Sequence, residues 1–307
     1  PKRDDGPLPL GRYDGRGGPP TFGGLPLALT KEDVIAGEVD VAILGAPLNM
    51  GSGWRDSGAQ ATVDLRLLGW PIGSMDQYVQ IVPNEVLSVI HFDSHYDAWW
   101  GGPHLIDHGA PVYRLINEGH VRAADYIQVG LRSAGPGKSA FKWMRENGMR
   151  YHTMAEVEKR GWDAVLDRVV AEASEEGRKL HISFDIDVLD PAFTPATGTP
   201  VPGGINMREA ISIVRRLCAE SNVVSFDLVE LHPALDPTYK TTLNSAHIIK
   251  ACLTGIAMNR EGMTEEHYLS PLASEHAVDD YYGDQQEHLD KTQAEKDKED
   301  EDKAKAD

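Results

Sequence analysis

The sequence predicts an α/β fold, a three-layer α-β-α sandwich built around a mainly parallel sheet. Short apolar runs that are typical of buried strands alternate along the chain with helix-length segments of amphipathic spacing. Strands that alternate with such helices form a parallel sheet that is covered on both faces. Two of the apolar runs end in groups of carboxylates, and sites in these sheets lie at the carboxyl ends of strands. A length of 307 residues allows one large α/β domain or two small ones.

The expected strands are apolar runs that are stopped by Gly, Pro or charged residues. They lie at 39–47, 88–93, 126–131, 150–153, 180–184 and 223–231. The expected helices lie at 62–68, 112–118, 141–146, from 163 to about 177, after Asn206, and at 245–258. Asp163 is a good N-cap residue, and Asn206 with Glu209 forms a capping-box pattern. Strand and helix therefore alternate along most of the chain.

The two ends of the chain differ in composition from the middle. Residues 1–26 are rich in Gly, Pro and charge and are expected to form a flexible arm, and the α/β domain is expected to span 27–270. Residues 271–307 carry 13 acidic and 5 basic side chains, which predicts a disordered acidic tail. An isolated charged helix near the end is the alternative.

Composition excludes several classes of partner. The net charge of −18 argues against nucleic acid. No apolar run approaches membrane-spanning length and no signal-peptide core is evident, so we expect no membrane association. Cys218 and Cys252 are the two cysteines and are expected to be buried free thiols, which fits a cytoplasmic location.

Two acidic motifs are the strongest functional signal. Asp93, His95 and Asp97 alternate after one apolar run, and Asp185 and Asp187 follow another. Because residues i and i+2 of a strand point to the same face, each motif gathers its side chains. Buried carboxylates repel one another unless a cation neutralises them. Oxygen-rich sites with some imidazole suit Mn²⁺, Zn²⁺, Ni²⁺ or Fe²⁺, and five or more donors indicate a pair of ions. Two acidic loops that follow strands by chance are the alternative.

The sequence around both motifs carries a family resemblance. Segment 93–97 (DSHYD) and segment 183–204 (SFDIDVLDPAFTPATGTPVPGG) resemble the metal motifs of the ureohydrolases, the arginase and agmatinase family. The resemblance extends from about Val39 to about Met258. It implies an arginase-like fold and metal-dependent hydrolysis of C–N bonds in linear amidines, which converts a guanidino compound to urea and an amine.

The resemblance also implies residue roles. Two divalent ions, Mn²⁺ or Ni²⁺, are expected to bind a ligand set of Asp93, His95, Asp97, Asp185 and Asp187, in which Asp93 and Asp185 bridge the ions. His108 corresponds to the family's proton shuttle, which makes His108 and Asp97 the expected catalytic residues. Glu230 corresponds to the carboxylate that pairs with the substrate guanidinium. Thr199 and Trp99 are expected to line the substrate site.

In one region the chain departs from the family pattern. Family members carry a Gly-Gly-Asp-His-Ser motif upstream of the first metal stretch, whose His binds the first ion, and this motif is absent from the sequence. Too few residues precede segment 88–93 for the strands and helices that the family pattern places there, which indicates an internal deletion near 87–88. A naturally shortened subunit, a shortened piece and an omitted segment all remain open. If that His ligand is absent, the chain is expected to hold only one ion or none instead of two. Possible substitutes are His104, His120, His152, His232 and His247.

Two functional hypotheses follow. In the first, the chain is an agmatinase-like hydrolase whose substrate is a small guanidino cation. In the second, it is a catalytically weak or inactive subunit of a heteromeric ureohydrolase, as in the guanidine- and metformin-hydrolysing members of the family. Either way a homo- or hetero-oligomer, a trimer or a hexamer, is expected. Trp99 and Trp100 offer aromatic faces that attract cations, which favours agmatine, guanidine or an N-alkylated guanidine or biguanide over arginine.

Overall fold

The computed structural model describes residue 35 and residues 41–43, 87–99, 108–135 and 137–263 of the chain. The predicted N-terminal arm, the helix at 62–68, Trp100, His104 and the acidic tail lie outside these residues. Of the predicted strand at 39–47 only 41–43 are described, and they do not form a strand.

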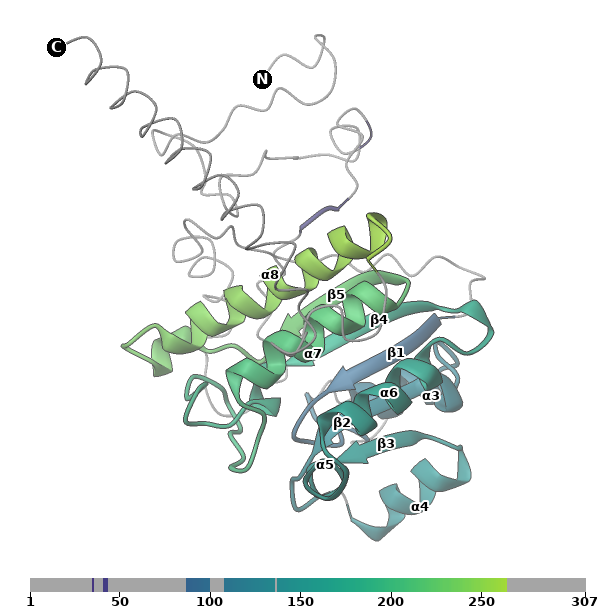
Figure 1. The fold of residues 1–307 in the computed structure, drawn as a ribbon. Coiled ribbons are helices and arrows are strands. Elements are labelled where there is room, and N and C mark those ends of the chain that lie inside the picture. The colour runs from purple at the N-terminus through teal and green to yellow at the C-terminus, as the bar shows by residue number, and fades with distance from the viewer. Residues whose placement is uncertain (1–34, 36–40, 44–86, 100–107, 136, 264–307) are drawn as a thin grey trace, which may run out of the picture. The chain divides into compact units, whose positions relative to one another are not determined.

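A five-stranded parallel sheet lies at the centre of the described part (Figure 1). Its strands are β1 (Leu87–Phe92), β2 (Tyr126–Leu131), β3 (Arg150–Thr153), β4 (Lys179–Asp185) and β5 (Val223–Val229). Their order is β3-β2-β1-β4-β5, and all the pairings are parallel. The chain thus runs outward from β1 to β3 and then crosses back to place β4 on the other side of β1. This reversal makes the β1–β4 boundary a topological switch point, where parallel sheets open a crevice at the strand ends.

Helices follow each strand. They are α3 (Pro111–Asn117), α4 (Lys138–Glu146), α5 (Met154–Arg160), α6 (Trp162–Ala173), α7 (Met207–Glu220) and α8 (Lys240–Arg260). None of the helices in the described residues is long and apolar enough to cross a membrane.

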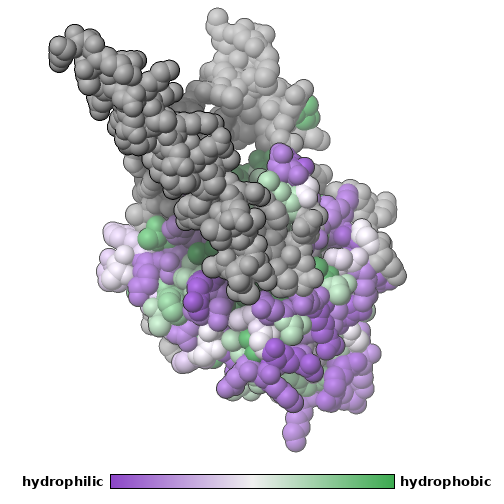
Figure 2. Space-filling view, viewed as in Figure 1, coloured by the Kyte–Doolittle hydropathy of each residue, from purple (hydrophilic) through white to green (hydrophobic). Residues whose placement is uncertain are grey.

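Each face of the sheet has its own hydrophobic core. Phe92 and Phe184 belong to the larger core, which contains buried side chains of α6, α7 and α8. Val89 and Tyr126 point to the opposite face and pack with buried side chains of α3 and α4. Helices on both sides of a parallel sheet confirm the predicted three-layer α-β-α class. Figure 2 shows that the described surface on one side is mostly hydrophilic, with apolar residues scattered among polar ones.

Several local predictions are confirmed. The strands at 126–131 and 150–153 have the predicted bounds. The capping box at the start of α7 is present, because Asn206 accepts from the Glu209 backbone and Glu209 accepts from the Asn206 backbone. Cys218 and Cys252 are buried and are not joined by a disulfide.

Other boundaries were predicted wrongly. Asp163 is not the N-cap of α6: Gly161, with φ 82°, occupies that position, and Asp163 lies in the first turn. The same glycine ends α5, a helix that the sequence did not predict. Only Gly161 separates the two helices, and its positive φ breaks the helical path. Because no loop-like segment lies between the helices, the sequence pattern did not reveal this break. α8 begins at Lys240 rather than near 245, since a carboxylate oxygen of Asp236 accepts the Thr241 backbone N–H (2.8 Å) at its start.

Candidate functional site

The acidic motifs meet at the switch point of the sheet. Asp93 directly follows β1, Asp185 is the last residue of β4, and Asp187 lies in the 3₁₀ turn Ile186–Val188. Because Phe92 pairs with Phe184 in register, the residues after both strands start from the same level of the sheet. Segments that lie 93 positions apart in sequence, as Ser94 and Asp187 do, therefore place their carboxylates in one crevice.

One candidate metal group consists of Asp93, His95 and Asp187. Their ligand atoms all lie within 4.8 Å of one another. His95 Nδ1 is 2.9 Å from Asp187 Oδ2 and 3.4 Å from Asp93 Oδ1. Two carboxylates and an imidazole from two strand ends form a donor set that suits a divalent transition metal.

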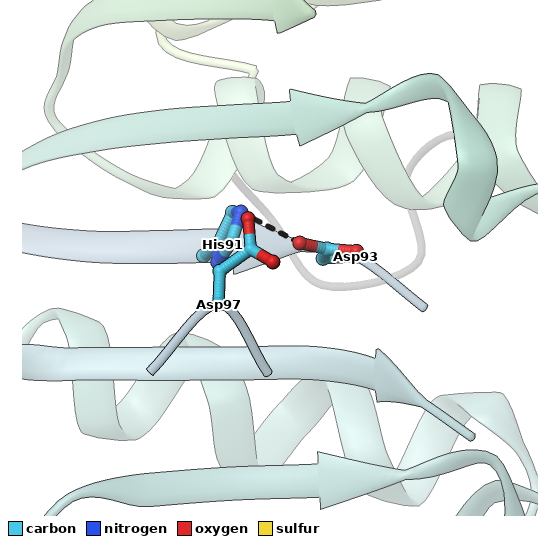
Figure 3. A group of neighbouring side chains, drawn as sticks. All are labelled: His91, Asp93 and Asp97. Carbon is cyan, nitrogen blue, oxygen red and sulfur yellow. Dashed lines mark ion pairs between the residues drawn. The ribbon is translucent and has the colours of Figure 1, made fainter. Parts of the chain in front are cut away.

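A second group consists of His91, Asp93 and Asp97, with ligand atoms again within 4.8 Å (Figure 3). The sequence did not single out His91 as a ligand. The signal was available, because His91 precedes Asp93 by two residues and so continues the period-two pattern of the motif onto the strand itself. Asp93 belongs to both groups, with one carboxylate oxygen toward each imidazole. The two oxygens of Asp93 therefore face two different candidate groups.

Asp185 does not join either three-residue group in the described part of the chain. It is buried, and its Oδ1 accepts the backbone N–H of Asp187 (2.8 Å). Burial, and then the nearby charges of Asp187 and Asp93, raise the pKa of Asp185 well above its usual value. Its bridging role therefore stays a prediction.

Hydrogen bonds fix the orientation of Asp187. Ser94 donates its hydroxyl (2.7 Å) and its backbone N–H (3.1 Å) to Asp187 Oδ1. The Thr199 hydroxyl donates to Oδ2 at 3.3 Å, so the predicted site residue Thr199 contacts a predicted metal ligand. Burial opposes ionisation of Asp187, but the hydrogen bonds from His95 and Ser94 outweigh it and lower its pKa. Asp187 is thus held as a carboxylate, the form that binds metal.

The guanidinium of Arg132 makes several hydrogen bonds to the loop that carries Asp187. Arg132 donates to the backbone carbonyls of Asp187 (2.8 Å), Val188 (3.0 Å) and Val201 (2.6 Å). A Cβ at Gly204 would lie 2.5 Å from the Asp190 backbone nitrogen and 2.6 Å from Arg132 Nη2, so only glycine fits at this position beside Arg132. Arg132 therefore joins the two ends of the long second motif, a role that the motif alone did not reveal.

The remaining carboxylates are unfavourable without a cation. Burial raises the pKa of Asp93 well above its usual value, and the charges of Asp97 and Asp187 add to this effect. Asp93 is fully buried, and its Oδ2 has no hydrogen-bond partner among the described residues. A buried carboxylate oxygen without a donor is costly, and a bound cation removes that cost. The residues present therefore fit divalent metal.

The metal-free protein should lose stability as pH rises from about 4 to 7. Burial, with a smaller contribution from Asp187, raises the pKa of Asp97 from its usual 3.8 to about 7. The folded state then binds more protons than the unfolded state between these values, so stability falls with increasing pH. Thermal melts in EDTA across this range test the slope. Asp97→Asn should flatten it, and an unchanged slope in that variant would contradict the assignment.

Glu230, a predicted substrate residue, forms a second cluster with two histidines, His108 and His232. Glu230 Oε1 lies 3.5 Å from His108 Nδ1, and Oε2 lies 3.6 Å from His232 Nε2. Burial opposes ionisation of Glu230, but the interactions with these two imidazoles outweigh it and lower its pKa to about 2. Glu230 (φ 60°) and Asp97 (φ 46°) both adopt left-handed backbone conformations, which are strained for such residues and are frequent at functional sites.

Trp99 lies at the edge of the described part of the site. Its side chain is 52% exposed, and its backbone N–H donates to the Gly109 carbonyl (3.1 Å), next to His108. An exposed indole in this position is available to a ligand, in line with the expected substrate role, which stays a prediction.

The structure describes four of the suggested substitute histidines. His120 is exposed beside Glu118, His152 is buried between Glu156 and Glu172, and His247 lies on α8. His232 lies beside Glu230. None of these four joins a candidate ligand group in the described residues.

Comparison with known proteins gives a consistent result. A family model described as the arginase family matches residues 69–255, more than half of the chain. An agmatinase of Chromobacterium violaceum is 34% identical over 168 residues, covering 53% of this chain and 47% of that protein. Arginase-1 of Bos taurus is 32% identical over 224 residues, covering 65% of this chain and 67% of that protein. This chain therefore spans about half the length of the agmatinase that it matches.

Solved structures share the fold. A hypothetical agmatinase from Burkholderia thailandensis superposes with a TM-score of 0.65 over 81% of this chain and 93% of that chain. At 24% identity this likeness supports the architecture alone.

Proposed function

Because this chain belongs to the arginase family, we propose that it hydrolyses the C–N bond of a guanidino compound with two divalent metal ions. The observation that carries the proposal is Asp93, which is shared by two candidate ligand groups and has a buried oxygen without a hydrogen-bond donor. His91 and Asp97 complete one group, and His95 and Asp187 complete the other.

In this proposal Glu230 binds and orients the substrate. A carboxylate that is ionised at all physiological pH values, as the pKa of about 2 indicates for Glu230, pairs well with a planar guanidinium. Such pairing supplies charge and a defined orientation of the reacting carbon. Divalent metal, when bound, lowers the pKa of water toward ~7 and offsets the negative charge of the carboxylates.

His108 is the proposed proton carrier. Hydrolysis forms a C–O bond from water, breaks a C–N bond and requires a proton on the departing amine. Imidazole titrates near neutrality and suits that transfer. His108 Nδ1 lies 3.5 Å from Glu230 Oε1, so the proton carrier and the substrate-binding carboxylate are neighbours.

We propose a small cation without a free carboxylate as the substrate: agmatine, guanidine, or an N-alkylated guanidine or biguanide. The exposed indole of Trp99 supports this, because aromatic faces attract cations by roughly 0.5–2 kcal/mol and accept N-methyl groups. Arginine should be a poor substrate, since its free carboxylate gains no such attraction from the Trp99 indole.

The test measures released amine or ammonia with Mn²⁺ or Ni²⁺ supplied, across arginine, agmatine, 4-guanidinobutyrate, guanidine and metformin. We expect kcat/KM for arginine to be at least about tenfold below that of the best substrate, equivalent to ~1.4 kcal/mol. Glu230→Gln keeps the size of the side chain but removes its charge, and should abolish turnover of every cation. Arginine as the best substrate would refute the proposed substrate class.

A second candidate is a catalytically weak or inactive subunit of a heteromeric ureohydrolase, favoured by the absence of a Gly-Gly-Asp-His motif from the sequence. On this view the chain assembles as a trimer or hexamer with an active partner. Metal analysis discriminates the two: two equivalents per chain support the enzyme, and none supports the inactive subunit. Assembly and a cytoplasmic location are part of the proposal, and the two buried thiols support a reducing compartment.

A further inference from the structure

His91 is a buried residue of the candidate metal group that also contains Asp93 and Asp97, and the proposed reaction does not yet give it a role. It lies on β1 with 4% of its surface exposed, and its side chain points to the same face as that of Asp93. Its Nε2 faces the carboxylate of Asp93, so a buried imidazole and a buried carboxylate meet at the end of β1.

The contact between His91 and Asp93 has the spacing of two ligands of one ion. His91 Nε2 lies 3.3 Å from Asp93 Oδ2 (Figure 3), yet Oδ2 has no hydrogen bond in the described part of the chain. Nitrogen and oxygen ligands each sit about 2.0–2.2 Å from a metal, which leaves neighbouring ligand atoms roughly 3–3.5 Å apart. The third member, Asp97, offers a carboxylate oxygen that lies within 4.8 Å of one ligand atom of each of the other two residues.

We infer that His91 is the imidazole ligand of one of the two ions, in a subsite that it forms with Asp93 and Asp97. The other subsite then consists of Asp93, His95 and Asp187. This inference rests on the proposed metal-dependent function and deepens it, because it assigns one imidazole to each ion, His91 from β1 and His95 from the segment that follows β1. Two carboxylates and one imidazole per subsite suit Mn²⁺, Ni²⁺, Fe²⁺ or Zn²⁺.

The second ring nitrogen of His91 faces Gln128 on β2. Gln128 Nε2 lies 3.4 Å from His91 Nδ1 and donates to the Tyr96 carbonyl at 2.9 Å, while its buried Oε1 lacks a partner among the described residues. A ligating histidine usually donates its other N–H to an acceptor. Turning the Gln128 amide exchanges the Tyr96 bond for one from Nδ1–H to Oε1. The tautomer of His91 therefore distinguishes two roles. A metal ligand carries its proton on Nδ1, whereas a simple hydrogen-bond donor to Asp93 carries its proton on Nε2.

The first experiment titrates the purified full chain with Mn²⁺ by calorimetry and measures bound metal after dialysis. His91→Leu and Asp97→Asn should each weaken the same ion by at least about 100-fold and leave the other bound, since even loss of a residue that only supports a ligand costs 10–100-fold. The variant that combines His91→Leu with Asp97→Asn should bind metal no more weakly than either single variant, because both changes affect the same ion. His95→Leu should remove the other ion. His152→Leu, which deletes an equally buried imidazole that contacts Glu156 and Glu172, controls for lost packing.

The second measurement does not need a variant to fold. Zn²⁺-loaded wild-type protein labelled with ¹⁵N at histidine should show His91 Nε2 as a coordinated nitrogen, with the proton on Nδ1. Protonated Nε2 in the loaded protein, or His91→Leu with two ions at wild-type affinity, would overturn this inference and leave the proposed hydrolysis intact. A wild-type chain that binds no divalent metal would overturn both.

Discussion

Asp93→Ala is expected to abolish the binding of both metal ions and to lower amine release by at least about 1000-fold. Asp93 is the one residue common to the two candidate groups, so its loss removes a ligand from each ion at once. Metal assistance contributes several kcal/mol to reactions of this class, and ~4 kcal/mol corresponds to three powers of ten in rate. Bound metal per chain and amine release measure the two effects separately.

Removing the charge of Asp93 should lower metal binding and activity but raise the stability of the metal-free protein. In EDTA, Asp93→Asn should melt at a higher temperature than the wild type, because the buried carboxylate near Asp97 and Asp187 no longer has to be protonated or tolerate repulsion. Adding Mn²⁺ should raise the melting temperature of the wild type but not that of the variant. Asp163→Ala, an exposed change in the first turn of α6, serves as the control. A metal-dependent rise in the Asp93→Asn protein would show that Asp93 is not a shared ligand.

Arg132→Met is expected to destabilise the protein by roughly 3 kcal/mol, the largest effect that we foresee on folding. Its guanidinium hydrogen-bonds the carbonyls of Asp187, Val188, Leu189, Val201 and Pro202, and also that of Gly130. Hydrogen bonds from charged groups contribute about 1.5–3 kcal/mol each, and the carbonyls left behind lose their partners. Chemical denaturation with and without metal measures the loss.

The affinities of the two ions distinguish the role proposed for Arg132 from that of an ordinary stabilising residue. Because it holds the loop that carries Asp187, its removal should weaken the ion bound by His95 and Asp187 more than the ion bound by Asp97. Arg132→Lys should not rescue the protein, since a point charge cannot reach several carbonyls as a planar fork does. Arg145→Met, an exposed change on α4, should alter stability by less than about 0.5 kcal/mol. Equal weakening of both ions would contradict the loop-holding role.

Local features of this protein were readable in the sequence. The strands at 126–131 and 150–153 and the capping box of Asn206 and Glu209 depend on neighbouring residues only. The same is true of the alternation of Asp93, His95 and Asp97, because strand geometry alone places such residues on one face. Backbone conformation and hydrogen bonds over a few residues are set by the residues themselves.

The sequence by itself therefore determined the class of fold, most of its strands and the chemical identity of the acidic motifs. Which groups meet was decided by the tertiary structure. The crossing of the chain from β3 back to the far side of β1 brings Asp187 to His95, and the loop after β5 brings Glu230 to His108. Strand order also puts Gln128 beside His91. These contacts join residues that are tens to more than a hundred positions apart, and their pairing follows from packing two hydrophobic cores on one sheet, which no local pattern encodes.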